Sequence, residues 1–138
     1  MADIRMIVVD YNTGDVTIDA SQPHLPLTDF EEAIQLFVVT MFTTIGTLVD
    51  DPSFGGSGKS LIGKNRDRSI EETRRKVGIV VHNTILALSR TQRSDSEYVI
   101  TESSLIDVEK TSRGIKMRVN IIFRDAPPAQ IGVSNVTI

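Results

Sequence analysis

The chain has 138 residues, a length that suits one domain able to bury most of its apolar surface. Fifteen Lys and Arg residues against eighteen Asp and Glu residues give a net charge of −3, so the overall basic charge that favours nucleic-acid binding is missing. The absence of cysteine excludes disulfide bonds and thiolate metal sites.

The N-terminal sequence, MADIRMIVVDY, does not resemble a secretory signal, because its apolar run is short and no small-residue cleavage site follows. No apolar stretch approaches the roughly 18 residues that a membrane span needs. We therefore expect a protein without membrane or nucleic-acid partners that acts inside a cell, or in a particle assembled there.

The first predicted element is a β-hairpin. Its first strand is rich in β-branched residues (Ile4–Tyr11), a polar turn follows (Asn12–Asp15), and its second strand alternates apolar and polar residues (Val16–Asp19). Two prolines then mark a linker. We expect residues 1–27 to form a hairpin and linker, distinct from a domain spanning residues 28–138.

A helix is predicted from Thr28, which forms a capping box with Glu31, to about Phe42. Its apolar residues fall on one face at helical spacing. They are Phe30, Ala33, Ile34, Phe37 and Met41. The opposite face carries Glu31, Glu32 and Gln35, so we expect this helix to pack one side on a core. Val39 and Phe42 interrupt the polar side, which leaves a second contact there open.

A second capping box, Ser69–Glu72, predicts a longer helix to about Ser89. Its core stripe is Ile70, Val77, Val81, Ile85 and Leu88. Ile79 and Leu86 lie nearly opposite. The favoured explanation is that the sheet covers one side and the first helix the other, and the alternative is that one side binds another protein.

The C-terminal third favours strands. Short strands are predicted at Tyr98–Ile100 and Leu105–Glu109, a longer one at Ile115–Arg124 and a last one at Ile131–Ile138. The long strand alternates apolar residues with Lys116, Arg118 and other polar residues, which is typical of a sheet with one wet face. The predicted fold class is α+β, with two main helices packed on a small antiparallel sheet.

Residues Gly58–Ser60 read GKS and suggest a phosphate-binding loop, but the glycine expected five residues earlier is Ser53, and the loop does not follow a buried strand. His24 and His82 have no partner at metal-ligand spacing. Adjacent acidic residues suit turns and helix starts better than catalysis. We therefore expect no enzyme activity, no cofactor and no metal.

The charged cluster Arg66–Lys76 has two interpretations. It is either a solvated helix start with ion pairs one turn apart, which is favoured, or a docking surface. An exposed strand near the end of the chain is a third candidate, because a free sheet edge can pair with a strand of a neighbouring molecule.

The segment Phe42–Ile62, FTTIGTLVDDPSFGGSGKSLI, resembles the short wedge subunit of contractile-tail baseplates, a phage family related to TssE of type VI secretion systems. The matching residues are Thr43, Thr44, Gly46, Asp51, Pro52, Phe54, Gly55, Leu61 and Ile62. The order of the predicted elements agrees over about residues 28–138. The same residues also make sense as a compact turn, in which Pro52 fixes φ and Phe54 packs on the helices.

The resemblance implies a non-enzymatic structural part, present in several copies in the tail baseplate of a virion and assembled in the host bacterial cytoplasm. In that family the subunit clasps a bundle of larger wedge proteins, and the tail sheath grows from its terminal sheet by strand exchange. The residues that this implies for partner binding are Phe54, Arg93, Ile115, Met117, Val119, Ile121, Ile131 and Val133.

One departure concerns the grip on the wedge bundle, where the family often has Glu-Pro-Arg and this chain has Thr91-Gln92-Arg93. Only Arg93 matches. Two rivals to the baseplate function remain: a free-standing adaptor that recognises its partner by strand addition, and a small nucleotide-binding protein.

Overall fold

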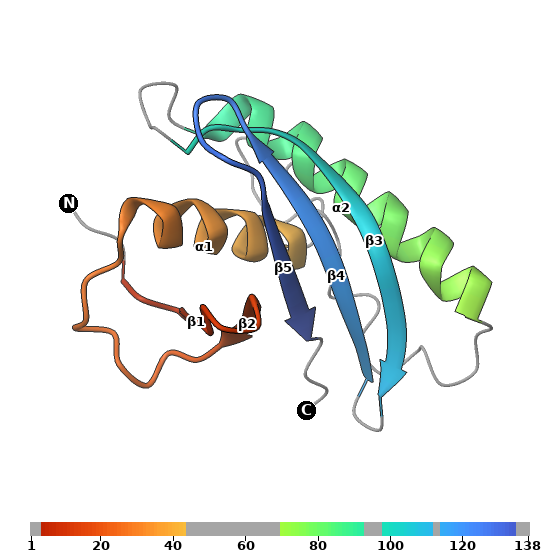
Figure 1. Cartoon of the computed structure of the whole chain (residues 1–138), viewed down its shortest axis with the longest axis horizontal. Helices are drawn as coiled ribbons and strands as arrows, with labels where there is room; N and C mark the ends of the chain where they lie inside the picture. The colour runs from red at the N-terminus through yellow and green to blue at the C-terminus, as the bar shows by residue number, and fades with distance from the viewer. Residues whose placement is uncertain (1–3, 44–69, 93–97, 112–113, 135–138) are drawn as a thin grey trace.

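The computed structural model describes residues 4–43, 70–92, 98–111 and 114–134. Within these ranges the chain forms two helices and a five-stranded sheet, and both helices lie against the same face of the sheet (Figure 1). The α+β class, the N-terminal hairpin and the mostly antiparallel sheet confirm the predicted fold.

The sheet has the strand order β1-β2-β5-β4-β3. The strands are β1 (Ile7–Val9), β2 (Asp15–Ile18), β3 (Ile100–Thr111), β4 (Gly114–Phe123) and β5 (Ala129–Ser134). The pairs β1–β2, β3–β4 and β4–β5 are antiparallel, whereas β2 and β5 pair parallel. The parallel pair is joined through both helices, as expected because parallel strands need a long connection.

Helix α1 (Asp29–Phe42) begins at the predicted capping box. The Thr28 hydroxyl accepts a hydrogen bond from the Glu31 amide at 3.1 Å, and the Glu31 carboxylate accepts one from the Thr28 amide at 3.0 Å. The predicted apolar face packs on the core, with Ile34, Phe37 and Met41 fully buried and Phe30 and Ala33 partly buried.

A second contact, which the sequence left open, buries two of the three polar residues on the opposite face of α1. Glu31 and Gln35 are each only 6% exposed. The N-terminal segment packs over them, so the hairpin and α1 bury polar groups that the helix alone would leave in water.

Helix α2 (Ile70–Thr91) confirms the second predicted helix and is two residues longer than expected at its C-terminal end. Most of its predicted core stripe is buried, with Ile70 and Ile85 partly so. The favoured expectation for the second apolar stripe is wrong, because Ile79 and Leu86 remain 50% and 52% exposed although α2 packs on both β3 and α1. The predicted cap at Ser69 lies outside the described residues.

Strand β3 is continuous where the sequence predicts two short strands separated by a loop. The polar run Thr101–Ser104 forms part of it because the strand lies at the edge of the sheet, where one side chain in two faces water. The pairing with β4 is irregular after Ile100 and again after Leu105. Each irregularity shifts by one residue the alternation of side chains between the two faces of the sheet. Val108 therefore returns to the buried face.

Strand β4 has the predicted alternation. Its apolar residues are all buried: Ile115, Met117, Val119, Ile121 and Phe123. The last predicted strand is present as β5, although the structure begins it two residues earlier and describes it only to Ser134.

The N-terminal hairpin turns at Gly14, whose φ is +79° and whose amide donates to the Asp10 carbonyl at 2.7 Å. Its second strand continues the sheet by pairing with β5. Ile7 and Val16 belong to the same buried cluster as the helices. The hairpin and the helices therefore share one core.

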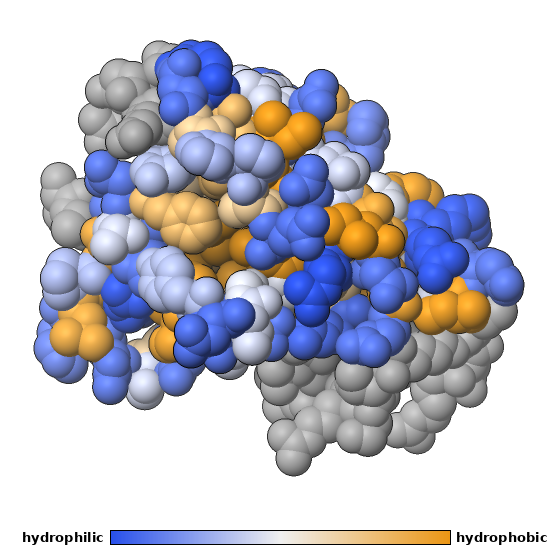
Figure 2. Space-filling view, viewed as in Figure 1, coloured by the Kyte–Doolittle hydropathy of each residue, from blue (hydrophilic) through white to orange (hydrophobic). Residues whose placement is uncertain are grey.

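The face of the sheet opposite the helices is turned toward the viewer in Figures 1 and 2, and no helix of the described ranges covers it. Hydrophilic residues dominate the view, with smaller hydrophobic areas between them (Figure 2). On this face the Lys116 ammonium lies 3.1 Å from the Asp15 carboxylate. Both side chains of this ion pair lie next to Gly132. A Cβ added to Gly132 would be 2.5 Å from the Asp15 carboxylate oxygen.

Candidate functional site at the edge of the sheet

The sheet ends in two strands of very different length. β1 has three residues, whereas β3 has twelve, and neither has a further strand beside it among the described residues. A long edge strand presents a row of main-chain donors and acceptors that can pair with another chain. β3 is therefore the larger candidate for strand addition.

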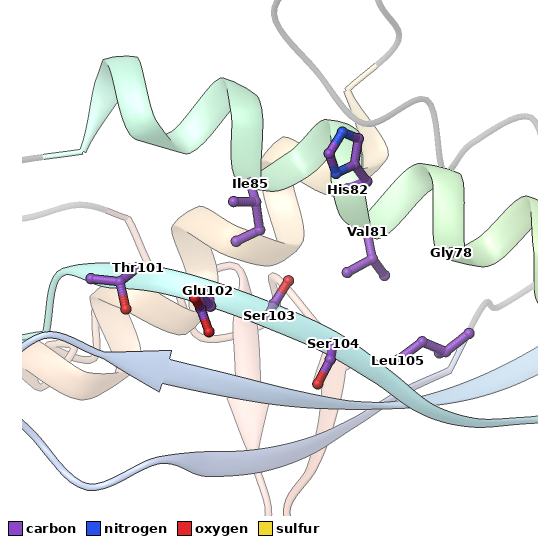
Figure 3. Close-up of a pocket in the computed structure, with 9 residues that line it drawn as sticks. All are labelled: Gly78, Val81, His82, Ile85, Thr101, Glu102, Ser103, Ser104 and Leu105. Carbon is purple, nitrogen blue, oxygen red and sulfur yellow. The ribbon is translucent and has the colours of Figure 1, made fainter.

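A pocket of about 320 Å³ lies beside this edge, between α2 and the first half of β3 (Figure 3). Its lining residues are Gly78, Val81, His82, Ile85 and the strand residues Thr101, Glu102, Ser103, Ser104 and Leu105. Val81 and Ile85 point from the helix toward the strand in Figure 3. The pocket thus combines an apolar wall from the helix with a mostly polar wall from the strand.

Three apolar side chains of these two elements are exposed. Ile79 and Leu86 lie on α2 nearly opposite Val81 and Ile85, the helix residues that line the pocket. Ile106, the next residue of β3 after the pocket, is 46% exposed.

Side chains already occupy the β3 edge at two points. At the first residue of the strand, the Gln92 side-chain amide donates to the Ile100 carbonyl at 2.6 Å and accepts from the Ile100 amide at 2.9 Å. Further along the strand, which ends at Thr111, the Val108 amide donates to the Asp107 carboxylate at 2.8 Å. We call residues 101–107, between these two contacts, the open edge segment.

The sequence does not predict the role of Gln92, because no motif or periodicity marks this residue. In the sequence it stands out only because the resembling family often has Glu-Pro-Arg where this chain has Thr91-Gln92-Arg93. A glutamine that pairs with a strand backbone eight residues later cannot be distinguished by sequence from a solvated one.

Charge near the pocket is mainly acidic on the strand side. Glu102 lines the pocket, is exposed, and has no ion pair within the described ranges. Asp107 pairs with Arg74 of α2 at 3.6 Å, with both side chains more than half exposed. Exposed pairs of this kind contribute little to stability.

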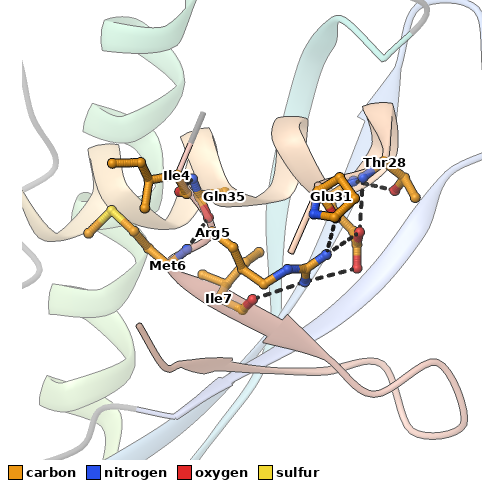
Figure 4. Close-up of polar contacts among 8 residues, drawn as sticks. Ile4, Arg5, Met6, Ile7, Thr28, Glu31 and Gln35 are labelled. Carbon is orange, nitrogen blue, oxygen red and sulfur yellow. Dashed lines mark hydrogen bonds and ion pairs between the residues drawn. The ribbon is translucent and has the colours of Figure 1, made fainter. Parts of the chain in front are cut away.

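The most buried charges of the described residues lie at the other end of the molecule and hold the N-terminal segment on α1 (Figure 4). The Arg5 guanidinium lies 3.0 Å from the Glu31 carboxylate, with side-chain exposures of 11% and 8%. Arg5 also donates to the Pro26 carbonyl at 2.6 Å. One turn further along the helix, the Gln35 side chain accepts from the Met6 amide at 2.7 Å.

Two opposing effects act on the pKa of Glu31. Burial alone would raise it, but hydrogen bonds from Arg5, the Thr28 amide and Tyr11, together with the Arg5 charge, lower the pKa below the ordinary 4.5. All of these partners belong to the fold, so we interpret this cluster as structural.

The structure corrects the predicted partner residues of the last two strands. The side chains are 0–1% exposed and form the core: Ile115, Met117, Val119, Ile121, Ile131 and Val133. They face the helices because alternate residues of β4 and β5 share that side of the sheet. β4 lies between β3 and β5, and β5 lies between β4 and β2, so an added strand has no edge at β4.

Of the signature residues, the structure describes Thr43, which ends α1. Its amide donates to the Thr40 carbonyl at 3.2 Å and its hydroxyl to the Val39 carbonyl at 2.8 Å. The remaining signature residues and two of the implied partner residues, Phe54 and Arg93, lie outside the described ranges. These signature residues are Thr44, Gly46, Asp51, Pro52, Phe54, Gly55, Leu61 and Ile62. The Gly58–Ser60 loop lies outside them as well.

Within the described ranges, no group of three or more His, Asp or Glu side chains is arranged to hold a metal ion. The helices of the same ranges are too short or too polar to cross a membrane. Comparison of the chain with models of protein families, with curated proteins and with solved structures gave no match.

Proposed function

We propose that this protein is a structural wedge subunit of a contractile phage-tail baseplate and that its β3 edge contacts the tail sheath. The open edge segment beside the α2–β3 pocket is the observation that carries the mechanism. The assignment to a baseplate rests on the sequence signature between Thr43 and Ile62.

The proposed contact is strand addition. A strand of a sheath subunit pairs with the open edge segment through main-chain hydrogen bonds, and its alternate side chains enter the α2–β3 pocket. This contact uses β3 in place of the two interior strands, β4 and β5, that the family resemblance implies. Several copies of the chain, each held by larger wedge proteins, would offer such edges in the baseplate.

A second candidate is a free-standing adaptor that recognises a different protein through the same edge. The open edge favours it equally, because strand addition does not depend on the identity of the partner. The two candidates differ in where the protein is found, so location in assembled particles distinguishes them.

The test is photo-crosslinking in assembled tails. A photoreactive residue replaces Ser104, which is exposed in the open edge segment, and a control carries it at Thr17, exposed on β2. We expect a crosslink to the sheath subunit from position 104 and none from position 17. Particles that lack the protein would contradict the baseplate assignment, and particles that contain it without a crosslink at 104 would contradict the β3 contact.

A further inference from the structure

Gly78 lies within α2, well inside the helix, where glycine is less favourable than every residue except proline. Apart from its chain neighbours and the backbone of its own helix, an ideal Cβ built on Gly78 meets no atom of the described residues within 4 Å, and its backbone is not in the left-handed region. Neither crowding nor backbone conformation in the described structure therefore requires glycine here. Alanine at this position would make a better helix.

The free space above Gly78 is part of the α2–β3 pocket. In Figure 3, Gly78 lies on the helix near the Leu105 end of the pocket, beyond Val81. Its missing side chain leaves room for an atom group that approaches the helix backbone closely. A glycine that weakens the helix and opens a pocket indicates that something else fills the position.

The strand wall of the pocket has an unused polar group. The Ser103 hydroxyl is buried, has no hydrogen-bond partner within the described ranges, and points toward the helix in Figure 3. A buried hydroxyl without a partner is unfavourable, and a bound chain that supplies a partner would remove that cost.

We infer that the pocket binds an extended segment of a partner protein that pairs with the open edge segment, packs an apolar side chain against Gly78, and places a Lys or Arg beside Glu102. The inference rests on the partner docking proposed above and specifies the chemistry of the partner strand. The contacts at Gln92 and Asp107 limit the pairing to residues 101–107.

Charge distinguishes this occupant from a second copy of the chain. Pairing two β3 edges over the open edge segment would bring Glu102 and Asp107 of one strand beside the same acidic residues of the other. Like charges on adjacent strands are destabilising, whereas a basic strand pairs favourably with them. The partner strand is therefore alternately apolar and basic.

The test uses the full chain and a fluorescein-labelled peptide of about nine alternating valine and lysine residues, long enough to span the open edge segment. A matched peptide has glutamate in place of lysine. Fluorescence anisotropy measures binding, and thermal unfolding measures stability. We expect the lysine peptide to bind and the glutamate peptide not to bind.

Gly78→Ala should raise Tm by about 3 to 5 °C, because alanine stabilises the helix. The same variant should weaken peptide binding about tenfold or more, because its methyl group occupies the pocket. Ser89→Ala, an exposed position of α2 that does not line the pocket, is the control and should leave binding unchanged. A stabilised Gly78→Ala protein that binds as tightly as the native chain would overturn the inference.

Glu102→Gln should weaken binding of the lysine peptide about two- to fivefold, as expected for an exposed ion pair. Glu71→Gln, another exposed carboxylate, is the control. Failure of the native chain to bind the lysine peptide would overturn the inference, as would a dimer that Gly78→Ala dissociates. Neither result depends on whether the protein is found in tail particles, so the inference and the baseplate assignment can fail separately.

Discussion

At the scale of single residues, two glycines lie where an added Cβ would come close to another group, but the groups differ. Gly14 has φ of +79°, and an added Cβ would lie 2.7 Å from the Gln130 carbonyl oxygen. At Gly132 an added Cβ would instead meet the end of the Asp15 side chain. Moving the Gln130 backbone away from an added methyl group would cost much free energy. The Asp15 carboxylate can instead rotate away about its side-chain bonds.

We therefore expect Gly14→Ala to lower the free energy of unfolding by about 2 to 3 kcal/mol, from strain at positive φ plus the backbone clash. Gly132→Ala should cost about 1 kcal/mol or less, since it displaces only a partly exposed ion pair. Urea unfolding of both variants beside the native chain measures the difference. Equal losses, or a larger loss for Gly132→Ala, would contradict this explanation.

At the scale of the helices and strands, the sequence predicts correctly those features that depend on residues close together in the chain. The capping box at Thr28 acts within one helical turn, and the alternation of β4 reports one burial face, so both were predicted correctly. The burial of Glu31 and Gln35 depends on residues about thirty positions away. Periodicity along α1 cannot show that another segment packs on its polar face.

The edge strand β3 was divided in the sequence prediction for a related reason. Its polar run resembles a loop, and only the sheet order places it at an edge, where polar residues and bulges are tolerated. The sequence could therefore predict the fold class, but not which edge is open. The open edge, with Gln92 at one end, is what defines the candidate site.

The contact between Gln92 and Ile100 joins the end of α2 to the start of β3, and we expect its loss to loosen that end of the strand. Gln92→Ala should lower the free energy of unfolding by about 1 to 2 kcal/mol, because it leaves a main-chain donor and acceptor without partners. Gln92→Glu should cost more, since a carboxylate oxygen would then face the Ile100 carbonyl.

Hydrogen exchange at the Ile100 amide is the direct readout, and we expect at least about tenfold faster exchange in both Gln92 variants. Gln130→Ala is the control, because Gln130 is exposed and has no side-chain hydrogen bond in the described structure. Unchanged protection of Ile100 in Gln92→Ala would show that the glutamine does not hold the strand.

At the scale of the whole molecule, the N-terminal hairpin and the helices share one core, so the ion pair between Arg5 and Glu31 stabilises the fold as a unit. Removing one partner of a mostly buried pair leaves the other without compensation. We expect Glu31→Gln to lower the free energy of unfolding by about 2 to 3 kcal/mol near neutral pH. The side-chain oxygen of a glutamine can still accept the hydrogen bond from the Thr28 amide. The lost stability therefore reports mainly the Arg5 charge left without its ion pair.

The same pair gives the stability a specific dependence on pH. The pKa of Glu31 in the folded protein lies below the ordinary 4.5, so its contribution is complete above about pH 4.5 and is lost as the pH falls through the folded value. The difference in unfolding free energy between the native chain and Glu31→Gln should therefore stay constant from about pH 7 to pH 5 and shrink below that. Urea unfolding across this range measures it.

Glu32→Gln is the control, because Glu32 lies in the same helical turn and has no arginine partner in the described structure; its difference from the native chain should be small at every pH. The other carboxylates are present in both the native chain and the variant, so their contributions cancel in the difference of unfolding free energies. If that difference grows on acidification for Glu31→Gln, burial and not Arg5 controls the pKa of Glu31.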